Sequence, residues 1–315
     1  MSGVGLVFGP VPSRRLGRSL GVNNIPAKSC TYSCVYCQLG RTLNLINARK
    51  SFYDPKSIVE AVYEKLKDVE VDYVTFVPDG EPTLDLNLGF EISRIKELGV
   101  KVAVLTNASL LWREDVRNDL AEAHLVSIKV DAINARTWKV VNRPHASLKL
   151  SEVLEGVKAF ARGFKGTLYS ETMLVEDVGQ MEEIEDIALF IRGLNVSRAY
   201  IAIPTRPPAE EWVKPPSEQQ LLKAYKVFIK ELGEGRVGLL TGFAEGEFGT
   251  ARNPREELLS IMSVHPMRRS EVERYLERSG VTPQLLEELL KSGDIVRLIY
   301  EGEEFYMRKL PGRKK

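Results

Sequence analysis

Cysteine and histidine are scarce in this chain of 315 residues, which contains three of each. All three cysteines lie within eight positions, at Cys30, Cys34 and Cys37. An odd number of thiols cannot be fully paired in disulfides, and a structural zinc site normally needs four protein ligands. The histidines are scattered along the sequence, which argues against a histidine metal site. The cysteine loop, residues 30–37, is therefore the feature that needs an explanation.

Long apolar runs and an excess of charge are also absent. The sequence has no apolar segment long enough to cross a bilayer, and its start does not resemble a signal peptide. Together with unpaired, clustered thiols, this predicts a reducing, cytoplasmic location and no membrane partner. The 44 basic and 43 acidic residues give a net charge of +1, which excludes a strong overall attraction to nucleic acid. Apolar residues make up 43% of the chain, enough for a sizeable core.

Short β-branched segments alternate with amphipathic helices through most of the chain. Six strands are expected, at residues 19–22, 71–77, 101–105, 125–130, 167–174 and 198–203. The helices expected after them lie at residues 55–69, 90–98, 113–123, 181–194, from 217, and in a segment capped by Ser151. Six such units predict an α/β fold in which a parallel sheet forms an open, partial (β/α)6 barrel over residues 1–249. The segment 8–18 is rich in glycine, proline and arginine, and we expect it to be an ordered loop.

The last part of the sequence, residues 250–315, has a different pattern. Helices are expected at 254–262, 270–279 and from 282, followed by a hairpin at 295–308. Three short helices followed by a hairpin resemble a winged-helix module. We therefore predict two domains, the partial barrel and a small winged-helix domain.

Polar residues follow the expected strands at their carboxyl ends, where parallel sheets collect functional groups. The candidates are Gly80, Glu81, Asn107, Ser127, Lys129, Asp131 and Glu171. Ser127, Lys129 and Asp131 alternate along one strand, so their side chains share a face. Because unpaired charge is costly inside a barrel, we interpret Lys129 and Asp131 as a pair that belongs to a binding site.

The cysteine loop itself points to an iron–sulfur cluster. A four-iron cluster prefers thiolate ligands, and three of them leave one iron open. The spacing C-x3-C-x2-C, with Tyr36 before the last cysteine, resembles the signature of radical S-adenosylmethionine (SAM) enzymes. The resemblance implies that Cys30, Cys34 and Cys37 hold a [4Fe-4S] cluster, that its open iron binds S-adenosyl-L-methionine, and that Tyr36 lies near the adenine. An electron from an external donor such as ferredoxin or flavodoxin would then yield a 5′-deoxyadenosyl radical. The alternatives are a zinc ion or an unliganded loop, and simple packing for Tyr36.

The resemblance also implies roles for the other candidates. The family usually carries Gly-Gly-Glu after the second strand, and here Asp79 replaces the first glycine while Gly80 and Glu81 are kept. Gly80 is expected to let the backbone approach the SAM amine and Glu81 to accept its hydrogen bonds, the alternative being an acidic turn. Asn107 is expected to bind the ribose or carboxylate of SAM, or else to cap a helix. The residues expected to line the same site are Ser127, Lys129, Asp131 and Glu171.

Further segments narrow the resemblance to one branch. Together with the cysteine loop, residues 9–22, 79–84 and 205–208 are similar to a mainly prokaryotic branch of radical SAM enzymes that is loosely grouped with the wyosine synthetases. Those synthetases remodel a guanine in transfer RNA and carry a second cysteine set for another cluster. This chain lacks that set, so we do not expect the identical reaction.

Two classes of substrate follow from these features. In an RNA-modifying enzyme, favoured slightly and acting on tRNA, the open barrel would receive an extruded base while the winged helix holds the duplex. In a protein- or peptide-modifying enzyme, the winged helix would dock a partner protein. Residues 250–315 contain thirteen basic and eleven acidic residues, and this near-neutral charge suits a protein partner at least as well as RNA. An iron–sulfur regulator that binds DNA would explain the winged helix but not the SAM-side residues. Arg14, Arg15 and Arg143 are expected to face the mouth and hold an anionic substrate, or else to be solvated surface residues.

Overall fold

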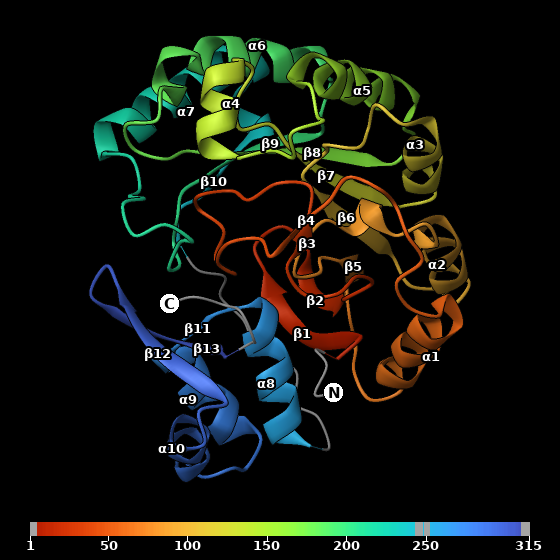
Figure 1. The fold of residues 1–315 in the computed structure, drawn as a ribbon, viewed down its shortest axis with the longest axis vertical. Helices are drawn as coiled ribbons and strands as arrows, with labels where there is room; N and C mark the ends of the chain where they lie inside the picture. The colour runs from red at the N-terminus through yellow and green to blue at the C-terminus, as the bar shows by residue number, and fades with distance from the viewer. Residues whose placement is uncertain (1–4, 243–247, 249–252, 310–315) are drawn as a thin grey trace.

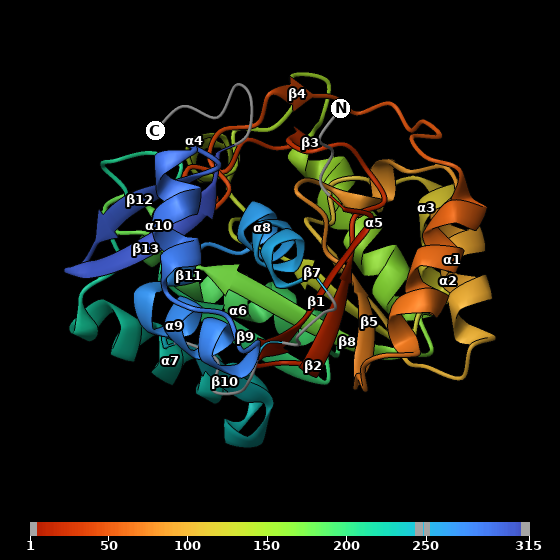
Figure 2. The ribbon, with the colours of Figure 1, turned by 90° about the horizontal axis from the view of Figure 1, so that it is seen from below.

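An open, eight-stranded sheet forms the centre of the molecule, in a computed structural model that describes residues 5–242, 248 and 253–309. The strand order is β1-β2-β5-β6-β7-β8-β9-β10, and every neighbouring pair from β2 to β10 is parallel. The strands are β1 (Val7–Ser13), β2 (Gly17–Val22), β5 (Tyr73–Phe76), β6 (Val102–Thr106), β7 (Leu125–Lys129), β8 (Thr167–Met173), β9 (Arg198–Ala202) and β10 (Val237–Leu240). The sheet curves into a barrel (Figure 2). Its two edge strands, β1 and β10, do not pair with each other, so the barrel stays open on one side.

All six predicted strands are present, but the sheet has two more. The expectation of a loop over 8–18 was wrong, because residues 7–13 form β1, which pairs antiparallel with β2. An edge strand tolerates Pro10 and Pro12 since its outer side needs no backbone donors, and the register shifts between Phe8 and Val11. The seventh parallel strand, β10, is only four residues long and was missed. Its Gly238 lies against the ring of Tyr200, where an added Cβ would approach to 2.8 Å.

Helices cover the outer face of the sheet (Figure 1). They are α1 (Pro55–Leu66), α2 (Leu88–Lys96), α3 (Glu114–Ala121), α4 (Ala135–Val141), α5 (Leu150–Gly163), α6 (Ile184–Gly193) and α7 (Glu218–Leu232). Ser217 caps α7 as predicted, in a capping box with Gln220. Ser151 does not cap α5, because this helix already begins at Leu150. The short helix α4 was not predicted. Among the described residues, no helix has both the length and the apolar character needed to cross a membrane.

The two faces of the sheet differ in character because side chains alternate along each strand. The fully buried residues on the helical side include Val74, Phe76, Val102, Val104, Val126 and Ile128. The opposite, inner face carries Thr75, Ser127, Lys129 and Glu171. The barrel interior is therefore polar near the carboxyl ends of β7 and β8, which is where the candidate site lies.

The C-terminal part has its own core and packs against β1 (Figure 1). It contains α8 (Pro254–Val264), β11 (Met267–Arg268), α9 (Arg269–Arg278), α10 (Gln284–Lys291), β12 (Ile295–Tyr300) and β13 (Glu303–Arg308). The strands form an antiparallel sheet in the order β11-β13-β12, of which β11 was not predicted. The expected boundary at residues 249 and 250 lies outside the described residues. Val11 of β1 packs against this second core, so the edge strand serves both parts.

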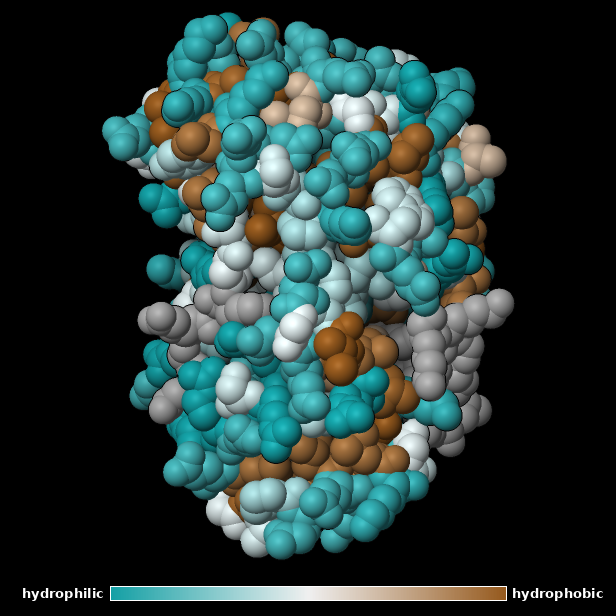
Figure 3. Space-filling model, turned by 90° about the vertical axis from the view of Figure 1, so that its left-hand side faces the viewer, coloured by the Kyte–Doolittle hydropathy of each residue, from teal (hydrophilic) through white to brown (hydrophobic). Residues whose placement is uncertain are grey.

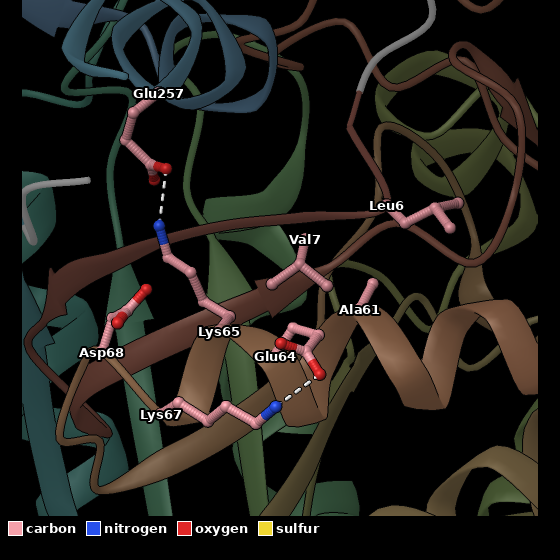
Figure 4. A pocket seen from close by; sticks show the side chains of 8 residues that line it. All are labelled: Leu6, Val7, Ala61, Glu64, Lys65, Lys67, Asp68 and Glu257. Carbon is pink, nitrogen blue, oxygen red and sulfur yellow. Dashed lines mark hydrogen bonds and ion pairs between the residues drawn. The ribbon is translucent and has the colours of Figure 1, made fainter. Parts of the chain in front are cut away.

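Glu257 of α8 joins the C-terminal part to the barrel. Its Oε1 accepts a 2.8 Å hydrogen bond from the backbone N–H of Gly9, and its Oε2 lies 2.6 Å from Nζ of Lys65 in α1. Figure 4 shows Lys65 reaching Glu257 across a surface pocket that Leu6, Val7 and Asp68 also line. This pocket lies outside the barrel and away from the cysteine loop, so we interpret it as part of the junction rather than as the reaction site.

We expect Glu257→Ala to lower the free energy of unfolding by about 2–3 kcal/mol, because it leaves the Gly9 N–H and the Lys65 ammonium without their shared partner. Denaturant unfolding followed by circular dichroism measures the change. Glu256→Ala is the matched control, since Glu256 is exposed on the same turn of α8. Equal stabilities of the two variants would contradict the role of Glu257.

Candidate active site

The cysteine loop lies at the carboxyl end of the first parallel strand, as predicted. After β2 the chain forms the short strand β3 (Ser29–Cys30), which pairs with β4 (Asn44–Leu45). The backbone N–H groups of Ser33 and Val35 donate to the carbonyls of Asn142 and Val141, at 3.0 and 2.9 Å. These bonds fasten the loop to the end of α4, so its shape is set by the barrel and not by the cysteines alone.

The three thiols are free and partly exposed, and the surroundings of Cys30 and Cys34 disfavour ionisation of those two. Burial raises the pKa of Cys30, and it raises the pKa of Cys34 to about 12, with the charge of Asp131 adding to the effect. A bound metal centre reverses this, because its positive charge stabilises thiolates. Amide donors already point at the sulfurs: Nδ2 of Asn107 lies 3.5 Å from Sγ of Cys30 and Nδ2 of Asn142 lies 3.5 Å from Sγ of Cys34. Three thiols on one shaped loop, with amide donors aimed at two of them, fit an iron–sulfur cluster.

Gly80 lies directly against the start of the cysteine loop. It bridges Ser29 in parallel fashion, and the N–H of Glu81 donates to the Ser29 carbonyl at 3.1 Å. An added Cβ on Gly80 would lie 1.8 Å from that carbonyl oxygen, and its φ of +155° is in a region that favours glycine. Within the protein, Gly80 is therefore needed for contact with the cysteine loop itself.

A buried lysine explains the aspartate that precedes Gly80. Lys28 Nζ donates to the Gly40 carbonyl at 2.7 Å and lies 3.6 Å from Oδ1 of Asp79, both side chains being 3% exposed. The backbone N–H of Lys28 also donates to the Asp79 carbonyl at 2.7 Å. Lys28 thus joins the segment before the cysteine loop to Gly40, which follows that loop, and to the turn after β5. The sequence did not indicate this role, because nothing in the neighbouring residues distinguishes Lys28 from a surface lysine.

Glu81 is buried and its carboxylate already has protein donors. Oε1 accepts hydrogen bonds from the hydroxyls of Thr83 and Thr106, both at 2.6 Å, and Oε2 accepts one from the backbone N–H of Asn107 at 2.7 Å. Burial raises the pKa of the Glu81 carboxyl, and these donors oppose that shift. The structure therefore brings Glu81 and Asn107 together, with Glu81 fixing the backbone that presents the Asn107 amide to Cys30.

Lys129 pairs with Glu171 and not with Asp131, which corrects the predicted Lys129–Asp131 pair. Lys129 and Glu171 lie opposite each other in the β7–β8 register, with Nζ 2.9 Å from Oε1, whereas Asp131 lies beyond the end of β7. Arg15 forms a second ion pair with Glu171. Ser127 lies one inward position deeper than Lys129 and is buried between Leu105 and Tyr169 of the neighbouring strands.

Asp131 holds the cysteine loop from the other side. It accepts hydrogen bonds from the Tyr36 hydroxyl, from Nδ2 of Asn142 at 2.7 Å and from the backbone N–H of Met173 at 2.8 Å. The ammonium of Lys129 lies 4.8 Å from the centre of the Tyr36 ring. Tyr36 is thus next to both Asp131 and Lys129. Asn142, which binds both Asp131 and Cys34, is a second residue that the sequence analysis missed.

Seven parallel strands in an open barrel, with a three-cysteine loop after the first, define a radical SAM partial barrel. The sequence model described as the Radical SAM superfamily matches residues 24–191, and the chain belongs to this superfamily. It is 43% identical over 314 residues to UPF0026 protein MJ1312 of Methanocaldococcus jannaschii, covering 98% of each chain. The predicted superfamily is thereby confirmed, and with it an enzyme that uses a [4Fe-4S] cluster and SAM.

Solved structures show the same fold at low sequence identity. Streptococcus suis SuiB bound to S-adenosylmethionine aligns with a TM-score of 0.52 and 16% identity, over 71% of this chain and 49% of that one. A structure of TYW1 with a lysine-pyruvate adduct aligns with a TM-score of 0.50 and 16% identity, over 68% of this chain and 73% of that one. The predicted open α/β barrel is confirmed by this likeness.

Proposed function

We propose that Cys30, Cys34 and Cys37 hold the cluster and that the polar groups beside them form the SAM site. When bound, the cluster and SAM supply a 5′-deoxyadenosyl radical for hydrogen abstraction. The observation that supports the assignment is the pair of amide donors, Asn107 and Asn142, aimed at Cys30 and Cys34. Hydrogen bonds to cluster sulfurs tune the reduction potential, so these amides fit the needs of a redox centre.

The remaining candidates divide into residues that position the site and residues that face it. Glu81 and Asp131 each bind several donors of the protein, so we assign them to positioning Asn107 and Tyr36. Gly80 keeps the turn after β5 close to the cysteine loop. The groups that we assign to the cofactor and substrate are Tyr36, Asn107, Ser127 and Lys129, and we assign Glu171 to positioning Lys129.

For the substrate, we propose RNA, with tRNA as the first candidate. The observation that favours it is the place of the C-terminal part, which we interpret as a winged-helix module. Nε2 of Gln38 donates to the Val264 carbonyl at 3.3 Å, so the end of α8 lies beside the residue that follows Cys37. A module in this position would hold an RNA duplex while a flipped base enters the open barrel. Hydrophilic residues cover much of the face that Figure 3 shows, and hydrophobic residues form patches in its lower half.

Modified-nucleoside profiles of RNA test this proposal. We expect at least one modified nucleoside to disappear from cells that lack the gene, and to return with the wild-type gene but not with Cys34→Ala. An unchanged profile would reject RNA. It would favour the second candidate, a protein- or peptide-modifying enzyme, which the near balance of charge in residues 250–315 supports.

A further inference from the structure

Cationic side chains converge where the C-terminal part meets the barrel. Arg206 lies in the loop after β9, and its Nε donates to the Pro266 carbonyl at 3.0 Å. Its Nη2 lies 2.9 Å from Nε2 of His265. Because a guanidinium only donates, this imidazole nitrogen accepts and the ring is neutral. Burial and the nearby arginines also lower the pKa of His265 well below its usual value.

Arg14, from the turn between β1 and β2, completes the group. Val11 of β1 packs against the core of the C-terminal part, which brings the turn that carries Arg14 to the side where Arg206 and His265 lie. The charge of Arg14 adds to burial in lowering the pKa of both of these residues. Arg15 is occupied by Glu171 inside the barrel. Arg14 is exposed and makes no hydrogen bond or ion pair within residues 5–242, 248 and 253–309. It is therefore available to a ligand.

A buried carboxylate holds two of the arginines in place. Oε1 of Glu271 in α9 lies 3.9 Å from Nη2 of Arg206 and 3.6 Å from Nη2 of Arg268. The Glu271 side chain is 3% exposed, while those of Arg206 and Arg268 are 11% and 20% exposed. The two guanidinium groups are thus partly desolvated, where an added anion interacts more strongly than it would in water.

The group lies beside the candidate active site. His265 follows Val264, which accepts the hydrogen bond from Gln38, and Gln38 follows Cys37. On the other side, the Tyr300 hydroxyl at the end of β12 donates to the Pro204 carbonyl at 3.3 Å. An anion bound here would therefore lie between the hairpin and the cysteine loop.

We propose that Arg14, Arg206 and Arg268 form a phosphate-binding site that holds the backbone of the RNA whose base enters the barrel. The inference rests on the proposed RNA substrate. Guanidinium groups suit it because their planar fork matches the non-bridging oxygens of a phosphodiester. Their origin in three separate segments would orient the RNA relative to both the barrel and the C-terminal part.

The test compares Arg14→Gln with Arg18→Gln in the full-length, reconstituted protein. Arg18 is the matched control. It lies in β2, directly after the turn that carries Arg14, but its side chain pairs with Glu70 and Asp72, away from the three arginines. Binding of a fluorescent tRNA is measured by anisotropy at several salt concentrations. We expect Arg14→Gln to weaken binding roughly 5- to 10-fold and to reduce the slope of log Kd against log salt by about one, because one phosphate contact is lost. Arg18→Gln should change neither quantity, and Arg14→Lys should restore the slope.

The outcomes separate the two proposals. If tRNA binds to the wild type but Arg14→Gln and Arg18→Gln behave alike, the phosphate site is wrong and the RNA substrate stands. If the wild type binds a polyglutamate peptide and not tRNA, the RNA substrate is wrong and the phosphate assignment falls with it.

Discussion

Cys34→Ala is expected to abolish both cluster binding and SAM cleavage. Two thiolates and an alanine leave a second iron without its ligand, and the Asn142 amide loses the sulfur at which it points. The protein is reconstituted anaerobically with iron and sulfide, and iron content is measured together with 5′-deoxyadenosine formed from SAM and dithionite. We expect both to fall to background.

Arg41→Ala is the control for this experiment, because Arg41 lies four residues after Cys37 and its side chain is 62% exposed. We expect it to keep the wild-type iron content. Wild-type amounts of iron and 5′-deoxyadenosine in Cys34→Ala would reject the assignment of the three cysteines.

Gly80→Ala is expected to have the second largest effect. Its Cβ would lie 1.8 Å from the Ser29 carbonyl oxygen and 2.8 Å from Cδ1 of Ile25, so β3 must move and displace Cys30. We expect a loss of about 3 kcal/mol in the free energy of unfolding and a lower iron content after reconstitution. Denaturant unfolding and iron analysis measure the two effects.

Gly99→Ala provides the matched control. Gly99 has a φ of +81°, but nothing lies within 4 Å of an added Cβ. We expect it to cost about 1 kcal/mol, since only the backbone conformation is strained, and to leave the iron content unchanged. If Gly80→Ala is no worse than Gly99→Ala, the close approach to Ser29 does not matter.

The sequence predicted a strand correctly wherever its residue pattern was typical of a strand at that place in the sheet. Alternating strands and helices predicted six of the seven parallel strands, because each unit of this fold is built from neighbours in the chain. β1 was missed since its prolines are typical of a loop, and only its place at the sheet edge makes them acceptable. β10 was missed because four residues carry too little periodicity.

The candidate site was predictable in its position and less so in its pairings. The carboxyl ends of parallel strands meet at one edge, which is why Glu81, Asn107 and the cysteine loop come together as expected. Which charged residues pair depends on the register between neighbouring strands. In the β7–β8 register, Glu171 lies opposite Lys129. The role of Lys28 depends on Asp79, which lies far along the sequence and reaches Lys28 only after folding.

Lys28 also has a consequence for how the enzyme is loaded and repaired. By tying Gly40 and Asp79 to the start of the loop, it fixes the shape of the cysteine loop through contacts that involve no sulfur. A loop that is already ordered loses little conformational entropy when iron and sulfide enter. If Cys30, Cys34 and Cys37 hold the cluster, we expect its loss to leave a folded apoprotein that takes up iron and sulfide again without unfolding.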